Sequence, residues 1–222
     1  MIVESDGLHW FVSDQLSGDR IGPDHEPELR SRILDLLPQG GVFVDVGAHV
    51  GCYSIRAAQK ASEVHAVEPN IEAIERLESN RYINNVHNMF IYPVAAWDKT
   101  EMLTLFSPNS FPRDASMRTL SGRPDATVPA VTLDELLFPF IERADLLKLD
   151  VEGADLQALE GMRSILANLK PTLIVEDHSV LGYFSAEALQ DKLRDLQYTT
   201  ELFGTYGGAN YWRCEHESRR TA

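Results

Sequence analysis

Several ionisable residues in this chain directly follow short, mostly apolar runs, and that position favours chemistry on a bound ligand. Asp45, Glu68 and Asp150 each follow such a run, and Glu176 and His178 follow another. Short apolar runs bounded by turn residues predict buried strands. Ligands of open α/β sheets bind outside the carboxyl ends of the strands. We therefore expect two clusters to converge on one crevice, namely Asp150 with Glu152 and Glu176 with Asp177 and His178.

A glycine loop follows the first of these strands. The sequence VFVDVGAHVG places Gly47 and Gly51 in a G-x-x-x-G spacing, and Glu68 lies 21 residues after Gly47. Glycine lets a backbone turn tightly and approach a ligand, and an acid about 20 residues later holds ribose hydroxyls in nucleoside-binding βαβ units. Residues 48–50 lack the middle glycine of a pyrophosphate loop. The spacing therefore favours a ligand such as S-adenosylmethionine, and an NAD-dependent oxidoreductase or epimerase is the alternative.

Four sequence blocks together resemble a known family. They are VDVGAHVGCYS, VHAVEPN, LLKLDVEGADLQALEGM and PTLIVEDH, and they extend in this order from about Val42 to His178. This pattern is similar to the FkbM family of S-adenosylmethionine-dependent methyltransferases. The resemblance implies a Rossmann-like class I methyltransferase fold and O-methylation of natural products or sugars. A module that binds S-adenosylmethionine without turnover is a further alternative.

The resemblance also implies where the cofactor binds. Asp45 and Gly47 would line its methionine end, Glu68 would accept hydrogen bonds from both ribose hydroxyls, and Trp97 would either stack on the adenine or pack in the core. The cofactor-binding residues expected in full are Asp45, Gly47, Ala48, His49, Gly51, Glu68, Pro69, Ala96, Trp97 and Asp150.

Methyl transfer to a hydroxyl requires an oriented acceptor and removal of a proton. His178 is the expected base, since the pKa of histidine lies near neutral pH, and Asp150 is the second candidate. A structural histidine is the alternative. Asp150, Glu176 and Asp177 would be able to hold a hard divalent cation, but the family pattern does not require one, and we expect no metal.

Composition limits the partners of the protein. The chain of 222 residues favours a single domain, and its net charge of −14 argues against nucleic acid and anionic membrane surfaces. The expected partner is therefore a small-molecule or sugar acceptor. Two cysteines make no disulfide framework, and the N-terminus carries no signal-peptide pattern. A cytoplasmic location is the expectation, and the sequence does not indicate an oligomeric state.

Alternating strand and helix patterns predict an α/β sheet, mostly parallel, with helices on both faces and a C-terminal antiparallel strand pair. Residues 1–38 form an N-terminal segment and helix, and residues 39–178 form the cofactor-binding core. Residues 107–127 are rich in Ser, Pro, Arg, Asp and Gly, and they predict a substrate-side loop. Strands are expected at 42–46, 64–67, 89–95, 102–106, 128–131, 146–149, 172–175, 198–203 and 210–214. Helices are expected at 24–37, 54–61, 71–83, 156–166 and 185–196.

Overall fold

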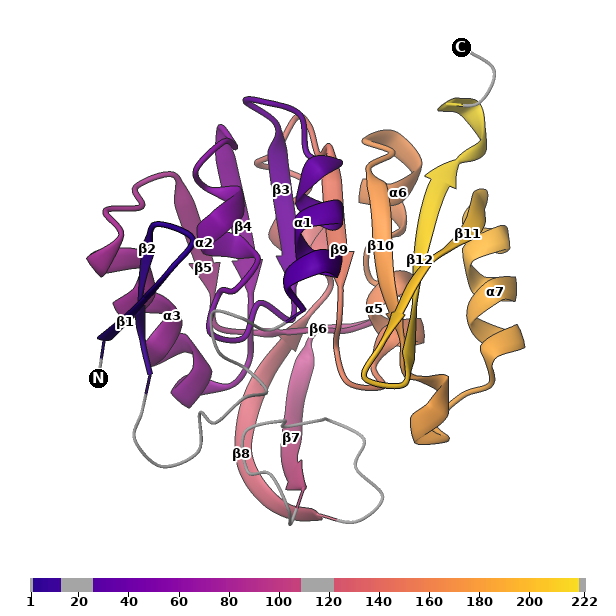
Figure 1. Cartoon of the computed structure of the whole chain (residues 1–222). Coiled ribbons are helices and arrows are strands. Elements are labelled where there is room, and N and C mark those ends of the chain that lie inside the picture. The colour runs from indigo at the N-terminus through magenta and orange to yellow at the C-terminus, as the bar shows by residue number, and fades with distance from the viewer. Residues whose placement is uncertain (1, 13–25, 109–121, 220–222) are drawn as a thin grey trace.

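A seven-stranded sheet forms the centre of the computed structural model, which describes residues 2–12, 26–108 and 122–219 (Figure 1). In spatial order its strands are β11 (Tyr198–Tyr206), β12 (Ala209–His216), β10 (Thr172–Asp177), β9 (Leu146–Leu149), β3 (Val42–Val46), β4 (Glu63–Val67) and β5 (Met89–Tyr92). β12 is antiparallel to both neighbours, whereas all pairs from β10 to β5 are parallel. The mostly parallel sheet with a C-terminal antiparallel pair confirms the predicted fold class.

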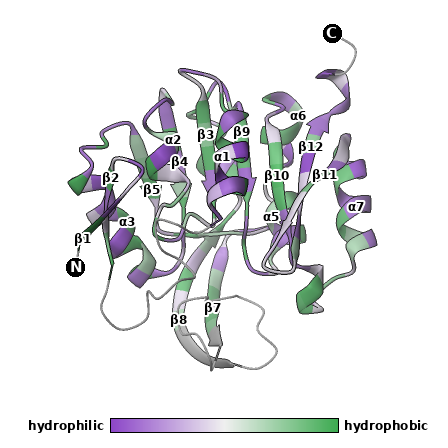
Figure 2. Cartoon of the chain, viewed as in Figure 1, coloured by the Kyte–Doolittle hydropathy of each residue, from purple (hydrophilic) through white to green (hydrophobic). Residues whose placement is uncertain are grey.

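Helices cover both faces of this sheet. One face carries α1 (Pro27–Asp35), α2 (Ser54–Ala57) and α3 (Ile71–Ile83), and the other carries α4 (Leu133–Leu136), α5 (Asp155–Glu160), α6 (Arg163–Asn168) and α7 (Ala186–Asp195). Successive strand residues point to opposite faces. Phe43 and Ile174 therefore pack under the first group, whereas Val44 and Val175 pack under the second. The central strands are mainly hydrophobic, and α7 shows alternating hydrophobic and hydrophilic bands (Figure 2).

Local capping signals position two helices. The Asn70 side chain accepts hydrogen bonds from the backbone N–H groups of Glu72 and Ala73 at the start of α3, as the sequence predicts. Ser185 caps α7 by accepting from the Ala188 N–H at 3.2 Å. Such caps satisfy backbone donors that a helix cannot pair internally. Because α3 begins at Ile71, three residues after Glu68, its cap also fixes the chain that leaves β4.

Two smaller sheets accompany the main one. β1 (Ile2–Ser5) and β2 (Leu8–Phe11) form a hairpin, and β6 (Ala95–Ala96), β8 (Gly122–Val131) and β7 (Glu101–Pro108) form a three-stranded sheet. The β7–β8 pair projects from the end of the main sheet at which β3, β9 and β10 finish (Figure 1). None of the described helices combines the length and apolar character needed to cross a bilayer.

The prediction of an irregular segment at 107–127 was wrong at both ends. β7 continues to Pro108, and β8 begins at Gly122 and pairs antiparallel with it. The Pro- and Gly-rich composition favoured a loop, but strand preference depends strongly on the neighbouring strand. Here, β7 contains several apolar residues and is the neighbouring strand that pairs with β8. Residues 109–121 lie outside the described residues.

The prediction of one continuous helix at 156–166 was also wrong. Two helices, α5 and α6, occupy this region, and Gly161 and Met162 separate them. A Cβ on Gly161 would lie 1.8 Å from the Trp97 carbonyl oxygen. The tight contact with the chain that enters β7 therefore requires glycine here. Similarly, the strand expected at 89–95 ends at Tyr92, and Ala95 begins β6 in the smaller sheet.

Candidate active site

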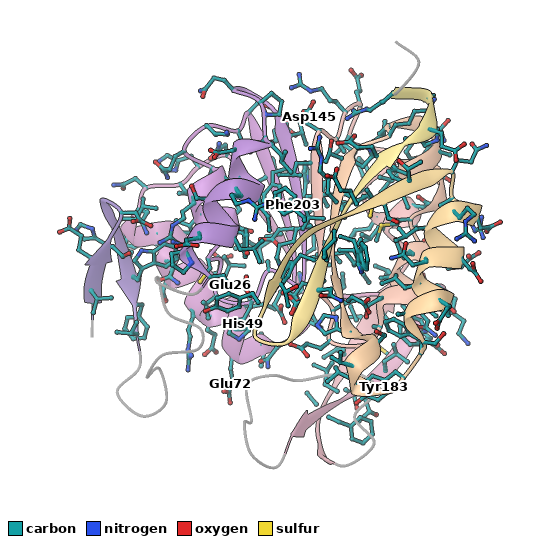
Figure 3. The ribbon with its side chains drawn as sticks, turned by 45° about the vertical axis from the view of Figure 1, so that its right-hand side comes forward. Glu26, His49, Glu72, Asp145, Tyr183 and Phe203 are labelled. Atoms are coloured by element: carbon teal, nitrogen blue, oxygen red, sulfur yellow. The ribbon has the colours of Figure 1, made fainter. Side chains whose placement is uncertain are left out.

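The candidate site lies where β3 and β9 end side by side. From these strands the chain continues to opposite edges of the sheet, β3 toward β4 and β9 toward β10, and ligands of open α/β sheets bind at such a switch point. The backbones are so close that a Cβ on Gly47 would lie 1.7 Å from the Asp150 carbonyl oxygen. Gly47 also has a φ of +86°, which favours glycine. His49 and Tyr183 lie toward this end of the molecule, and Asp145 lies at the opposite end (Figure 3).

The glycine loop is bonded to the end of β4. The backbone N–H groups of Gly47 and Ala48 donate to the Val67 carbonyl at 2.9 and 3.1 Å. Glu68 then accepts from the His49 N–H at 2.9 Å and from the Asn70 N–H at 2.8 Å. Glu68 is buried, and this burial raises its pKa to about 7. The loop and the acid expected to act together are therefore in direct contact.

Asp45 lies beneath this loop with 1% of its surface exposed. Its Oδ2 accepts a hydrogen bond from the Ser54 hydroxyl at 2.5 Å, whereas its buried Oδ1 has no hydrogen-bond partner among the residues that the structure describes. Burial raises the pKa of Asp45. Buried polar atoms are rarely left unpaired, so this oxygen fits a hydrogen-bond donor on a bound ligand.

A buried lysine that sequence reasoning missed stabilises the charge of Asp150. The Nζ atom of Lys148 donates to Asp150 Oδ2 at 2.6 Å, and Lys148 pairs in register with Asp45 on β3. It also lies 4.7 Å from the centre of the Tyr53 ring. Burial alone would lower the pKa of Lys148, but Asp150, Asp45 and Glu176 raise it. A lysine inside an otherwise apolar strand was the available signal, since buried lysines are rare unless paired.

His178 lies at the end of β10 among carboxylates. Its Nδ1 is 3.1 Å from Asp155 Oδ1, and its Nε2 is 3.5 Å from Asp150 Oδ1 and 3.9 Å from Glu176 Oε1. Burial alone would lower the pKa of His178, but the hydrogen bond and charge of Asp155, helped by Asp150 and Glu176, raise it to about 10. A protonated ring accepts no proton, so this shift disfavours His178 as the base, and its catalytic role stays a prediction.

The two carboxylates beside His178 differ in protonation. Burial alone would raise the pKa of Asp150, but Lys148 and His178 lower it to about 2. Burial raises the pKa of Glu176 well above its usual value, and the charge of Asp150 adds to this effect. Asp150 therefore stays charged while Glu176 takes up a proton more readily, as expected for two carboxyl groups that share one site.

The other predicted site residues have different surroundings. Asp177 points away from this group, since its oxygens accept from the Ser179 N–H and from Trp212 Nε1. Asp177 therefore does not lie with Asp150 and Glu176 in the oxygen ligand set that the sequence would allow. Ala96 is buried in the main core, and Trp97 Nε1 donates to Glu101 at 3.0 Å. Pro69 separates Glu68 from the Asn70 cap.

A buried glutamate connects the start of α1 to the site. Glu26 is 4% exposed and accepts hydrogen bonds from the hydroxyls of Tyr53 at 2.7 Å and Tyr211 at 2.5 Å. Burial and the charge of Glu26 raise the pKa of Tyr53. No sequence motif indicated this group, because its three members come from distant parts of the chain and meet only through the fold.

Comparisons with known proteins agree with this geometry. A family model described as the methyltransferase FkbM domain matches residues 45–200. The hexuronic acid methyltransferase AglP of Haloferax volcanii is 25% identical over 155 residues, which cover 69% of this chain and 63% of that protein. The tRNA (guanine(37)-N(1))-methyltransferase 1 of Vitis vinifera is 37% identical over 97 residues, which cover 39% of this chain and 16% of that protein. The chain thus spans less than two thirds of either relative.

Among solved structures, the methyltransferase FkbM from Methylobacillus flagellatus KT is similar with a TM-score of 0.56 and 16% sequence identity. The similarity covers 84% of this chain and 50% of that one. At this identity the likeness shows the fold alone, which is the class I methyltransferase fold. Because the family model extends from β3 into β11, the chain belongs to the FkbM family of methyltransferases.

Proposed function

We propose that the chain transfers a methyl group from S-adenosylmethionine to a hydroxyl group of a small molecule or sugar. The main support is the glycine loop, which is hydrogen-bonded to Val67 and Glu68 and faces Asp150 across the junction of β3 and β9. Asp45 and Gly47 would hold the methionine end of the cofactor and Glu68 its ribose. The buried Oδ1 of Asp45 fits a donor such as the ammonium group of the methionine end.

The acceptor would lie beside Asp150, Glu176 and His178. S-adenosylmethionine supplies an electrophilic methyl carbon, and its sulfur keeps the electron pair of the broken C–S bond. The acceptor oxygen forms the new C–O bond and passes its proton to a carboxylate at the edge of the crevice. Asp150 is more accessible than His178 for this step, since 25% of its side chain is exposed against 5% for His178.

Calorimetry and a turnover assay test this proposal. We expect S-adenosylhomocysteine to bind with a Kd of roughly 1–100 μM, or about −8.2 to −5.5 kcal/mol, and NAD to give no heat. Production of S-adenosylhomocysteine should then be measured with a panel of hexuronic acids, other sugars, phenols and tRNA. Binding of NAD without S-adenosylhomocysteine would contradict the assignment. Binding without turnover on any acceptor would leave the non-catalytic module as the better description.

A further inference from the structure

Three side chains at the ends of β9 and β10 place one metal-ligating atom each around a common point. Asp150, Glu176 and His178 have a carboxylate oxygen or imidazole nitrogen within 4.8 Å of one another. The His178 side chain is only 5% exposed, and its Nε2 points at Asp150 Oδ1 from 3.5 Å and at Glu176 Oε1 and Glu152 Oε2 from 3.9 Å each. These separations are too long for hydrogen bonds.

The spacing matches the edges of a metal coordination shell. Ligand oxygens and nitrogens lie about 2.0–2.2 Å from a transition-metal ion. Neighbouring ligands are then roughly 3.0–3.5 Å apart in octahedral or tetrahedral geometry, and opposite ligands about 4 Å apart. The 3.5 Å distance from His178 Nε2 to Asp150 Oδ1 matches neighbouring ligands, and the 3.9 Å distance to Glu176 Oε1 lies between the neighbouring and the opposite spacing. The three atoms therefore need only small movements to contact one ion.

Neighbouring side chains already hold two of these ligands in the required orientation. Asp155, which is fully buried, accepts at its Oδ1 from His178 Nδ1–H at 3.1 Å and so directs Nε2 into the group. Lys148 donates to Oδ2 of Asp150, and Oδ1 of the same carboxylate faces His178 Nε2 at 3.5 Å. Histidines that bind metals usually donate their second nitrogen to a carboxylate in this way.

We propose that Asp150, Glu176 and His178 bind one divalent transition-metal cation, and that its remaining positions take two adjacent oxygens of the methyl acceptor. A nitrogen ligand beside two carboxylates suits Mn²⁺, Fe²⁺ or Zn²⁺ better than Ca²⁺ or Mg²⁺, which prefer oxygen. The acceptor class that fits is a vicinal diol or a hydroxy acid. Metal binding stands on the geometry alone, whereas the acceptor role rests on the proposed methyltransferase function.

The cation would also change how the proton leaves the acceptor. A metal-bound hydroxyl is more acidic than a free one, so the proton passes to water as the oxygen forms the C–O bond. Asp150 then serves as a ligand and not as the proton acceptor. Coordination requires a neutral imidazole, so His178 releases its Nε2 proton to water when the ion binds, and the ring then serves as a ligand instead of the base that the sequence led us to expect.

Electron paramagnetic resonance with Mn²⁺ tests the site on the full chain after treatment with a chelator. We expect one Mn²⁺ per chain with a Kd below roughly 1 mM, and nitrogen modulation of the electron spin echo from one imidazole. His178→Gln should abolish the modulation, and both His178→Gln and Glu176→Gln should weaken binding at least about 100-fold. Asp155→Asn, which leaves the ligands in place, should weaken it by roughly 10–100-fold. Glu201→Gln, an exposed acid on β11, is the matched control and should change nothing.

The unmodified protein keeps this test decisive even if a variant fails to fold. Absence of Mn²⁺ binding up to roughly 1 mM, with S-adenosylhomocysteine still bound, would overturn the metal site and leave the methyltransferase proposal intact. Mn²⁺ bound without nitrogen modulation would also overturn the site, because the ion would lie elsewhere. Mn²⁺ bound at His178 without any binding of S-adenosylhomocysteine would support the site and contradict the proposed function.

Discussion

At the scale of single residues, Glu68 both holds the glycine loop and faces the expected ribose position. Each of its oxygens already accepts one backbone hydrogen bond, and a carboxylate oxygen can accept a second. Burial raises its pKa from 4.5 to about 7. The folded protein therefore keeps a proton on Glu68 below about pH 7 and loses it above, and hydroxyl donors bind best to the ionised form.

We therefore expect the affinity for S-adenosylhomocysteine to rise about tenfold between pH 6 and pH 8, in proportion to the ionised fraction of Glu68. Glu68→Gln should weaken binding at pH 8 by roughly 10–100-fold, the usual effect of losing hydrogen bonds to a charged group, and should remove the pH dependence. Calorimetry at the two pH values measures both effects. Glu72→Gln, an exposed acid in the first turn of α3, is the control. A pH profile that survives in Glu68→Gln would assign the titration to another group.

The sequence was most informative where a residue type and its position act together. Asp45, Glu68 and Asp150 end predicted strands, and strand ends meet at one edge of a parallel sheet. Lys148 was missed although a lysine inside an apolar strand is a usable signal, whereas Asp155 was missed because an acid in a first helical turn has no local pattern that distinguishes it. The environment of His178 was not predictable from the sequence for a related reason. Its pKa depends on Asp155, Asp150 and Glu176, and only the tertiary structure places all of these beside the ring.

At the scale of elements, buried strands were predictable because burial on both faces leaves nearly continuous apolar runs, as in β3 and β10. The ends of β7 and β8 were not predictable, since antiparallel pairing outweighs a Pro- and Gly-rich composition there. The division of α5 from α6 was also hidden. It depends on a contact between Gly161 and the Trp97 carbonyl, which no local pattern encodes.

The close approach of β3 and β9 makes a prediction about Gly47. Gly47→Ala would place a Cβ against the Asp150 carbonyl at a φ of +86°, so the two strand ends must separate. Gly207→Ala in the β11–β12 turn is the matched control, because its φ is +58° but no atom lies within 4 Å of the added Cβ. The control should cost about 1–2 kcal/mol of unfolding free energy, and Gly47→Ala should cost at least about 2 kcal/mol more. Urea unfolding measures both. Equal losses would show that the two strand ends adjust without strain.

At the scale of the whole molecule, charge separates two classes of acceptor. The chain carries 34 acidic against 20 basic residues, for a net charge of −14, and the candidate site adds buried acids at the ends of β3, β4, β9 and β10. The negative electrostatic potential from these acids attracts the positively charged sulfonium of the methyl donor and repels phosphate backbones. The chain is 37% identical to a tRNA methyltransferase over 97 residues, but its acidic net charge favours a small-molecule acceptor over RNA.

We therefore expect no useful affinity for RNA. At physiological salt, proteins that do bind nucleic acid hold even non-specific sequences with a Kd of about 10⁻⁴ to 10⁻⁶ M, through lysine and arginine contacts to phosphates. This chain should bind tRNA more weakly than about 10⁻⁴ M, and methyl transfer to a hydroxylated small molecule should proceed unchanged when tRNA is added. Fluorescence anisotropy with labelled tRNA measures the affinity, and a salt series identifies its source. Micromolar binding that falls steeply with salt would reveal a basic contact surface and would move the acceptor from sugars to RNA.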